Sequence, residues 1–136
     1  MMVVDTNILI YLAMDMPQTE AVKAWAARDP DWCVPGMAWT ELANTLAGGV
    51  RASRIAAPVA LGILQTHRER VTTLPEADTL DVLQTALATG LTAYDAEFVV
   101  AARRAGLKLL TNDPAVLRAC PDVAVALDCE RKSAKT

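Results

Sequence analysis

Residues 92–114 read TAYDAEFVVAARRAGLKLLTNDP, and this stretch decides the fold. Its first part predicts a helix over 92–105 that ends at Gly106, because glycine is the usual residue just past a helix end. The apolar run 107–110 then predicts a short buried strand. Asp113 follows within three residues of that strand. A helix feeding directly into a buried strand, with an acid at the strand's exit, favours an α/β domain.

The rest of the chain repeats this alternation of strand and helix. Four further strands are predicted, over 1–4, 32–34, 71–74 and, after the strand 107–110, over 123–127. Between them we expect helices over 8–12, from Pro17 to about 28, around 39–46 with a stop at Gly48-Gly49, over 53–70 with Ser53 as cap, over 75–88 closed by Gly90, and a short one near 116–117. This order predicts a three-layer α/β/α fold with a mostly parallel central sheet. We expect one domain over 1–128 and a flexible basic tail over 129–136.

Composition excludes several classes of protein. The chain has 136 residues, 53% of them hydrophobic, which is enough to bury a core. No stretch is apolar for long enough to predict a membrane span or a secretion signal. The formal net charge of -3 argues mildly against a general nucleic-acid binder. Three cysteines without metal-ligand spacing predict buried free thiols and a cytoplasmic protein.

Four acids stand at positions where chemistry is expected. Asp5 and Asp113 follow strands, and ligands of parallel sheets bind beyond the carboxyl ends of the strands. Glu41 and Asp95 lie near the starts of helices whose neighbouring residues are small or apolar. An acid on a largely buried helix needs a partner. Lysine and arginine are sparse near all four, so a divalent cation such as Mg²⁺ or Mn²⁺ is the partner we expect.

The four acids lie in motifs that resemble those of the PIN domain. Val4-Asp5-Thr6-Asn7 resembles the start of that domain, Thr40-Glu41-Leu42 its second acidic motif, Tyr94-Asp95-Ala96 its third and Thr111-Asn112-Asp113 its fourth. Order, spacing and chain length all match, over nearly the whole chain. The chain looks most like the VapC toxins of type II toxin–antitoxin systems. Each motif alone is weak evidence for the resemblance, whereas the four motifs in this order are strong evidence together.

The resemblance implies a Mg²⁺- or Mn²⁺-dependent endoribonuclease that cleaves RNA phosphodiester bonds with a metal-activated water. Asp5, Glu41, Asp95 and Asp113 would be the catalytic and metal-binding residues. Thr6, Asn7 and Thr111 would orient those carboxylates through hydrogen bonds. The resemblance also implies a homodimer, a cognate antitoxin protein, and a substrate such as tRNA, rRNA or mRNA. A solitary PIN-domain RNA-processing nuclease is the alternative within the family.

Each acid also has a purely structural interpretation. Asp5 and Asp95 are suited to cap a helix, Glu41 to face solvent, and Asp113 to form a turn before Pro114. Other functions remain open as well: a non-catalytic binding scaffold, a receiver-like signalling domain or a phosphatase with an aspartyl nucleophile. A receiver needs two adjacent acids after the first strand and a lysine after the last, and such a phosphatase needs a second aspartate where Asn7 stands.

The remaining polar residues are expected to be structural. His67, the only histidine, follows Thr66 in a charged helix end and is expected at the surface. The three tryptophans are expected in the core. The apolar stripes of the second helix and of the helix 53–70 fit either the core or a surface that a dimer or antitoxin would cover.

Overall fold

The computed structural model describes residues 1–128, so the expected tail at 129–136 lies outside the described residues. Five short strands form one sheet in this part of the chain: β1 (Met2–Val4), β2 (Trp32–Val34), β3 (Thr72–Thr73), β4 (Leu109–Thr111) and β5 (Ala124–Ala126). Their order is β3-β2-β1-β4-β5, and every neighbouring pair is parallel. The predicted α/β fold is confirmed, and the sheet is wholly rather than mostly parallel over the described residues.

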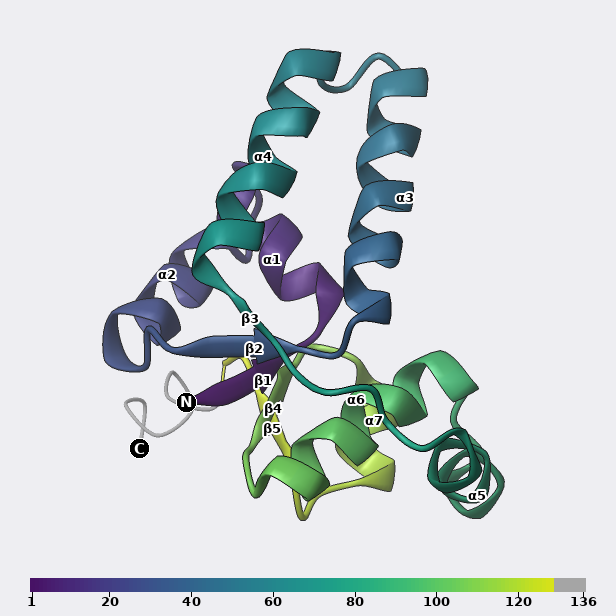
Figure 1. The fold of residues 1–136 in the computed structure, drawn as a ribbon. Helices are drawn as coiled ribbons and strands as arrows, with labels where there is room; N and C mark the ends of the chain where they lie inside the picture. The colour runs from purple at the N-terminus through teal and green to yellow at the C-terminus, as the bar shows by residue number, and fades with distance from the viewer. Residues whose placement is uncertain (129–136) are drawn as a thin grey trace.

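Seven helices connect these strands within residues 1–128. They are α1 (Thr6–Ala13), α2 (Thr19–Arg28), α3 (Met37–Arg51), α4 (Ala57–Arg70), α5 (Thr79–Thr89), α6 (Ala93–Ala105) and α7 (Pro114–Ala119). Figure 1 shows α1, α3 and α4 on one side of the sheet and α6 and α7 on the other. None of the described helices has both the length and the hydropathy needed to cross a bilayer.

The central strands are apolar on both faces because helices cover both faces. Val3 and Val4 of β1, and Leu110 of β4, have no exposed surface. Fully covered parallel strands are typically continuous runs of valine, isoleucine and leucine. The main core therefore surrounds β1 and β4, and it includes the predicted core residues Trp32 and Trp39. Two of the three cysteines, Cys33 and Cys120, are buried free thiols, as expected.

Helices α3 and α4 form a long antiparallel hairpin that stands away from the sheet (Figure 1). Two predictions about this region are wrong. Gly48-Gly49 does not end a helix, because α3 continues to Arg51, and Ser53 does not cap α4, which begins at Ala57. Ser53 instead lies in the turn with φ 58°, the left-handed region that only a few non-glycine residues adopt. Smaller differences concern helix starts: α2 begins at Thr19 rather than Pro17, and α5 begins at Thr79 behind the cap Asp78.

The strand order places a topological switch at β1. The chain runs from β1 outward through β2 to β3, then crosses to the other side of β1 and continues through β4 to β5. At such a switch the connections leave the carboxyl ends of two adjacent strands in opposite directions, which opens a crevice. Asp5 follows β1 and Asp113 follows β4 at this point. The fold thus brings two acids that are 108 residues apart in sequence to one edge of the sheet.

Candidate active site

A cavity of about 170 Å³ lies at this switch point, and we call it the carboxylate cavity. All four predicted acids line it: Asp5, Glu41, Asp95 and Asp113. They come from four different places, namely the end of β1, the first half of α3, the first turn of α6 and the start of α7. The other residues lining it are Thr6, Asn7, Asn44, Thr45 and Phe98.

Asp5 is fixed at the base of the cavity by hydrogen bonds from two directions. It is the N-cap of α1, and its carboxylate accepts from the backbone N–H of Ile8 at 3.2 Å. The Thr111 hydroxyl donates to the other carboxylate oxygen. Thr111 also accepts from the backbone N–H of Asp113 at 3.1 Å. Thr111, buried on β4, therefore joins Asp5 to the segment that carries Asp113.

Glu41 reaches the same cavity from α3. Its carboxylate accepts a hydrogen bond from the Thr6 hydroxyl at 3.2 Å. Thr6 is buried in the first turn of α1, so this bond connects α1 and α3 directly above the end of β1. Thr6 and Thr111 thus each hold one carboxylate, whereas the Asn7 side chain lines the cavity without a hydrogen bond among the described residues.

Asp95 and Asp113 combine a place in the cavity with local roles at helix starts. Asp113 caps α7, and its carboxylate accepts from the N–H of Ala115 at 2.9 Å. The cap of α6 is Thr92, which accepts from the N–H of Asp95 at 3.1 Å. The Asp95 carboxylate is thereby left free of capping in the first turn of α6. Negative charge in a first turn is favoured by the helix dipole.

Burial and repulsion between carboxylates make the ionised forms of Asp5, Glu41 and Asp95 unfavourable. Burial raises the pKa of Asp5, against the lowering effect of the Thr111 hydrogen bond. Burial also raises the pKa of Glu41, with Asp95 and Asp5 adding to the effect, and that of Asp95, with Asp113 adding to it. Carboxyl groups held together in a partly buried site behave in this way unless a cation compensates them.

No lysine or arginine lines the carboxylate cavity in the described part of the chain. Two cations that lie near these acids in sequence, Arg103 and Lys108, have partners elsewhere. Arg103 forms a bidentate pair with Asp122 at 3.1 Å, and the Lys108 ammonium donates to the Asp122 backbone carbonyl at 2.7 Å. The carboxylates are therefore uncompensated by the protein side chains around them.

The donor set suits a hard divalent cation. Carboxylate oxygens are the ligands that Mg²⁺ and Mn²⁺ prefer, and Mg²⁺ commonly keeps several waters while one or two carboxylates bind it. Within residues 1–128, no three acidic, histidine or cysteine side chains are arranged to hold an ion together. The carboxylate oxygens that line the cavity are of the kind that such an ion prefers. That these residues bind a metal stays a prediction.

Three lining residues were not expected from the sequence. Asn44 and Thr45 lie three and four residues after Glu41 and so share its face of α3, and Phe98 lies three residues after Asp95 on α6. Helical spacing from the predicted acids could have identified them. Glu97 lines a neighbouring cavity instead, where burial and Glu76 raise its pKa.

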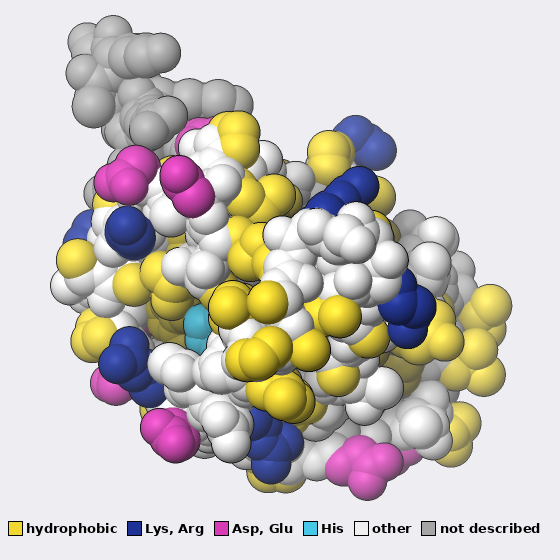
Figure 2. Space-filling view, turned by 90° about the horizontal axis from the view of Figure 1, so that it is seen from above, with side chains coloured by type: hydrophobic (Ala, Val, Ile, Leu, Met, Phe, Trp, Pro, Cys, Tyr) yellow, Lys and Arg dark blue, Asp and Glu magenta, His cyan; other side chains and the backbone are white. Residues whose placement is uncertain are grey.

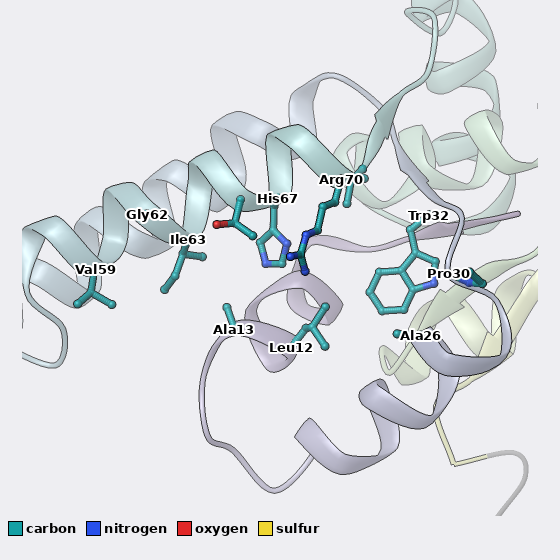
Figure 3. A pocket seen from close by; sticks show the side chains of 12 residues that line it. Leu12, Ala13, Ala26, Pro30, Trp32, Val59, Gly62, Ile63, His67 and Arg70 are labelled. Atoms are coloured by element: carbon teal, nitrogen blue, oxygen red, sulfur yellow. The ribbon is translucent and has the colours of Figure 1, made fainter.

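A second, larger cavity of about 600 Å³ lies between α1, α2 and α4, and we call it the apolar groove (Figure 3). Leu12, Trp32 and Ile63 line it, and Arg70 lies between His67 and Trp32. Viewed from above, the single histidine lies at the bottom of a hollow bordered by hydrophobic side chains (Figure 2).

The groove corrects the prediction that His67 is a surface residue. His67 is 5% exposed, and its Nε2 lies 2.9 Å from the backbone carbonyl of Leu9. Because a carbonyl only accepts, Nε2 carries the proton in this bond. Burial lowers the pKa of His67, with nearby Arg70 contributing. The histidine therefore ties α4 to α1.

Comparison with known proteins places this architecture in a family. The model of the PIN domain matches residues 2–120. A search among curated proteins finds no significant match. Among solved structures, PAE2754 from Pyrobaculum aerophilum superposes with a TM-score of 0.78 at 23% identity, covering 98% of this chain and 95% of that one.

Two further solved structures share the fold. FitAcB from Neisseria gonorrhoeae has a TM-score of 0.66 at 20% identity, covering 93% of this chain and 96% of that one. A toxin–antitoxin complex from Klebsiella pneumoniae has a TM-score of 0.61 at 18% identity, covering 93% and 98%. At such identities these likenesses concern the fold, whereas the family model covers most of the sequence. The chain belongs to the PIN domain family.

Proposed function

We propose that this chain is a Mg²⁺- or Mn²⁺-dependent endoribonuclease that acts as the toxin of a toxin–antitoxin pair. One observation carries the proposal: four carboxylates converge on one cavity at the switch point of the sheet, with no described cation lining it. Such an arrangement is costly for the folded protein unless a divalent ion is bound. A protein would keep four such carboxylates together where the bound ion performs chemistry.

Asp5, Glu41, Asp95 and Asp113 would hold the ion or the waters around it. When bound, the ion would supply a nucleophile at neutral pH and neutralise charge on the attacked phosphate. The chain's own residues do the positioning. Thr111 fixes the Asp5 carboxylate and Thr6 fixes that of Glu41, so both acids are held in place before substrate arrives.

The competing functions fit the geometry less well. A receiver-like domain needs a lysine close to its acids, whereas Lys108 is bonded to Asp122 outside the carboxylate cavity. An aspartyl-nucleophile phosphatase needs a second aspartate at the position of Asn7. A non-catalytic scaffold would have no need to keep four acids together against their repulsion.

The toxin role brings a protein partner, and the apolar groove is the surface we expect it to use. The groove is the larger of the two cavities and is mostly lined by apolar side chains. Gly62 adds open space, because a Cβ built there would meet no atom within 4 Å. An apolar antitoxin segment with an acid placed near Arg70 would fit this lining. The similar structure from Klebsiella pneumoniae is a toxin–antitoxin complex, which supports such a partner.

The homodimer expected from the family would use another surface. Leu80, Leu83 and Leu87 form one stripe along α5 and are 63%, 55% and 76% exposed. Helix α5 packs on α6 at the outer edge of the molecule, so nothing in the described chain covers this stripe (Figure 1). Exposed leucines at this spacing are typical of a helix that packs against a partner. Light scattering of Leu83→Glu against wild type tests this surface.

A cleavage assay tests the nuclease directly. We expect wild type to cleave structured, tRNA-like RNA with Mg²⁺ or Mn²⁺ and to lose this activity in EDTA. Asp5→Asn and Asp95→Asn should lose at least about a hundredfold, whereas Asp122→Asn, a carboxylate outside the cavity, should retain activity. Metal-independent cleavage, or full activity in Asp5→Asn, would contradict the proposal.

Expression in a host separates the toxin from a solitary nuclease. A toxin should arrest growth when expressed alone, and Asp95→Asn should not. A small DNA-binding protein encoded next to the gene should relieve the arrest. RNA cleavage in vitro without any growth effect would instead favour an RNA-processing nuclease.

A further inference from the structure

Helix α3 extends the carboxylate cavity into a polar surface that leads away from it. Glu41, Asn44 and Thr45 line the cavity, and Gly48 and Arg51 continue the same side of the helix over the next two turns. From Glu41 to Arg51 the helix rises about 15 Å, at roughly 1.5 Å per residue. Figure 1 shows α3 rising from the sheet to the tip of the α3–α4 hairpin.

The packing around position 48 does not require a glycine there. A Cβ built at Gly48 would meet no atom within 4 Å, whereas one at Gly49 would lie 3.3 Å from Cγ1 of Ile55. Gly49 is therefore explained by the close approach of the α3–α4 turn. Gly48 sits inside a helix, where glycine is destabilising relative to alanine, without any such reason. Glycine at an open surface position is expected where the backbone of another molecule approaches closely.

The polar groups on either side of Gly48 are free to bind a ligand. Asn44 and Thr45 are exposed, and their side chains form no hydrogen bond with the described residues. Arg51 is also exposed, and no ion pair of its guanidinium is found over residues 1–128. In contrast, Arg103 and Arg104 are both paired with aspartates.

We propose that this side of α3 is a binding track for single-stranded RNA, formed by Asn44, Thr45, Gly48 and Arg51. The proposal rests on the nuclease function proposed above. The scissile phosphate lies at the carboxylate cavity, and the adjoining nucleotides run along α3. Asn44 and Thr45 hydrogen-bond to the strand, its backbone passes over Gly48, and Arg51 pairs with a phosphate. The track supplies the cationic contact that the cavity itself lacks.

The test compares binding of short and long RNA to the full chain. Fluorescein-labelled oligouridylates of 2 and 12 nucleotides are titrated, with Ca²⁺ in place of Mg²⁺, and followed by anisotropy. Wild type should bind the 12-mer at least tenfold more tightly, because only the longer strand reaches Arg51. Gly48→Leu and Arg51→Gln should reduce this ratio to within twofold. Arg51→Gln should also lower the slope of log affinity against log salt by about 0.7, the loss of one phosphate contact on a single strand.

Matched controls lie on α2. Ala24→Leu places the same leucine side chain at an exposed position of another helix, and Lys23→Gln removes another exposed charge. Both should keep the wild-type ratio of affinities. Thermal melting checks that Gly48→Leu is folded, as expected from the open space around Gly48.

The outcomes separate failure of the track from failure of the nuclease. If wild type cleaves RNA but both track variants keep the length dependence, the track is wrong and the nuclease stands. If wild type neither cleaves nor binds RNA, both proposals are contradicted. If Gly48→Leu changes only the oligomeric state, the surface belongs to a second copy of the chain, and the track is again wrong.

Discussion

Thr111 is the residue on which the arrangement of Asp5 and Asp113 depends. It is 1% exposed, donates to the Asp5 carboxylate and accepts from the backbone of Asp113. Thr111→Val removes the hydroxyl while keeping the shape of the side chain. We expect activity to fall by about 10- to 100-fold, the usual cost of losing a group that orients a metal-binding carboxylate. The measurement is kcat/KM for RNA cleavage with saturating Mn²⁺.

The same substitution should change the pH dependence of cleavage. The Thr111 hydrogen bond lowers the pKa of Asp5, against burial, so its loss should raise that pKa further and move the acid limb of the profile to higher pH. Thr19→Val is the matched control, because Thr19 is a buried threonine bonded only to the backbone around α1. Thr19→Val should lower the stability of the fold without shifting the acid limb of the pH profile. An unshifted limb in Thr111→Val would contradict this role.

His67 makes the stability of the fold depend on pH. Its pKa is lowered in the folded protein by burial, so below the ordinary value of 6.5 the unfolded chain binds a proton that the folded chain resists. The free energy of unfolding should therefore fall as the pH drops below about 6.5, by at most about 1.4 kcal/mol per pH unit.

His67→Gln isolates this effect because glutamine does not titrate in that range and can still donate to the Leu9 carbonyl. The buried carboxylates, whose raised pKa values act in the opposite direction on acidification, are present in both proteins and cancel in the difference. Urea unfolding between pH 5 and 7.5 should show wild type gaining stability over the variant as pH rises, with a plateau above about pH 7. Parallel curves would refute the assignment.

At the scale of whole elements, the glycines show which helix ends can be predicted from the sequence and which cannot. Gly90 and Gly106 end α5 and α6 as predicted, with φ of 75° and 68°. Gly48-Gly49 also consists of glycines but continues α3, because Leu46 before them and Val50 after them both pack against the core. Tertiary packing contributes most of the stability of a helix in a protein, and it is not visible in a local pattern.

Alanine substitutions at two glycines should have opposite effects on stability. Gly106→Ala forces a Cβ into the left-handed region and should cost about 1 kcal/mol. Gly62→Ala lies inside α4, where a Cβ meets no atom within 4 Å, and should stabilise by about 1 kcal/mol through helix propensity alone. Both are measured by urea unfolding at neutral pH. Effects of the same sign would contradict the helix boundaries described above.

At the scale of the molecule, the strand order explains which parts of the site could be predicted. Asp5 and Asp113 follow predicted strands, so the general rule for parallel sheets places them together. Glu41 and Asp95 could be predicted as site residues only from the resemblance to PIN domain motifs. No local sequence pattern indicates that α3 and α6 meet at that edge of the sheet. Asn44 lies three residues after Glu41, so helical spacing could have placed it beside that acid once Glu41 was assigned to the site.

The grouping of four acids also predicts how the whole protein responds to a divalent ion. Without an ion, burial and repulsion disfavour ionised Asp5, Glu41 and Asp95. An ion that binds only the folded state should stabilise it by about 2.7 kcal/mol at a hundred times its Kd. Millimolar Mn²⁺ should therefore raise Tm by several degrees. The rise should be larger at pH 8 than at pH 5.5, because protonated carboxyls compete with the ion.

Two variants distinguish specific binding from a general effect of the ion. Glu41→Gln removes one of the repelling carboxylates, so it should melt at or above the wild-type Tm without metal, yet gain much less from Mn²⁺. Asp122→Asn removes a carboxylate outside the cavity, one that pairs with Arg103, so its gain from Mn²⁺ should equal that of wild type. Equal gains in all three proteins would mean that the ion acts elsewhere on the surface. The four carboxylates would then need another explanation for their convergence.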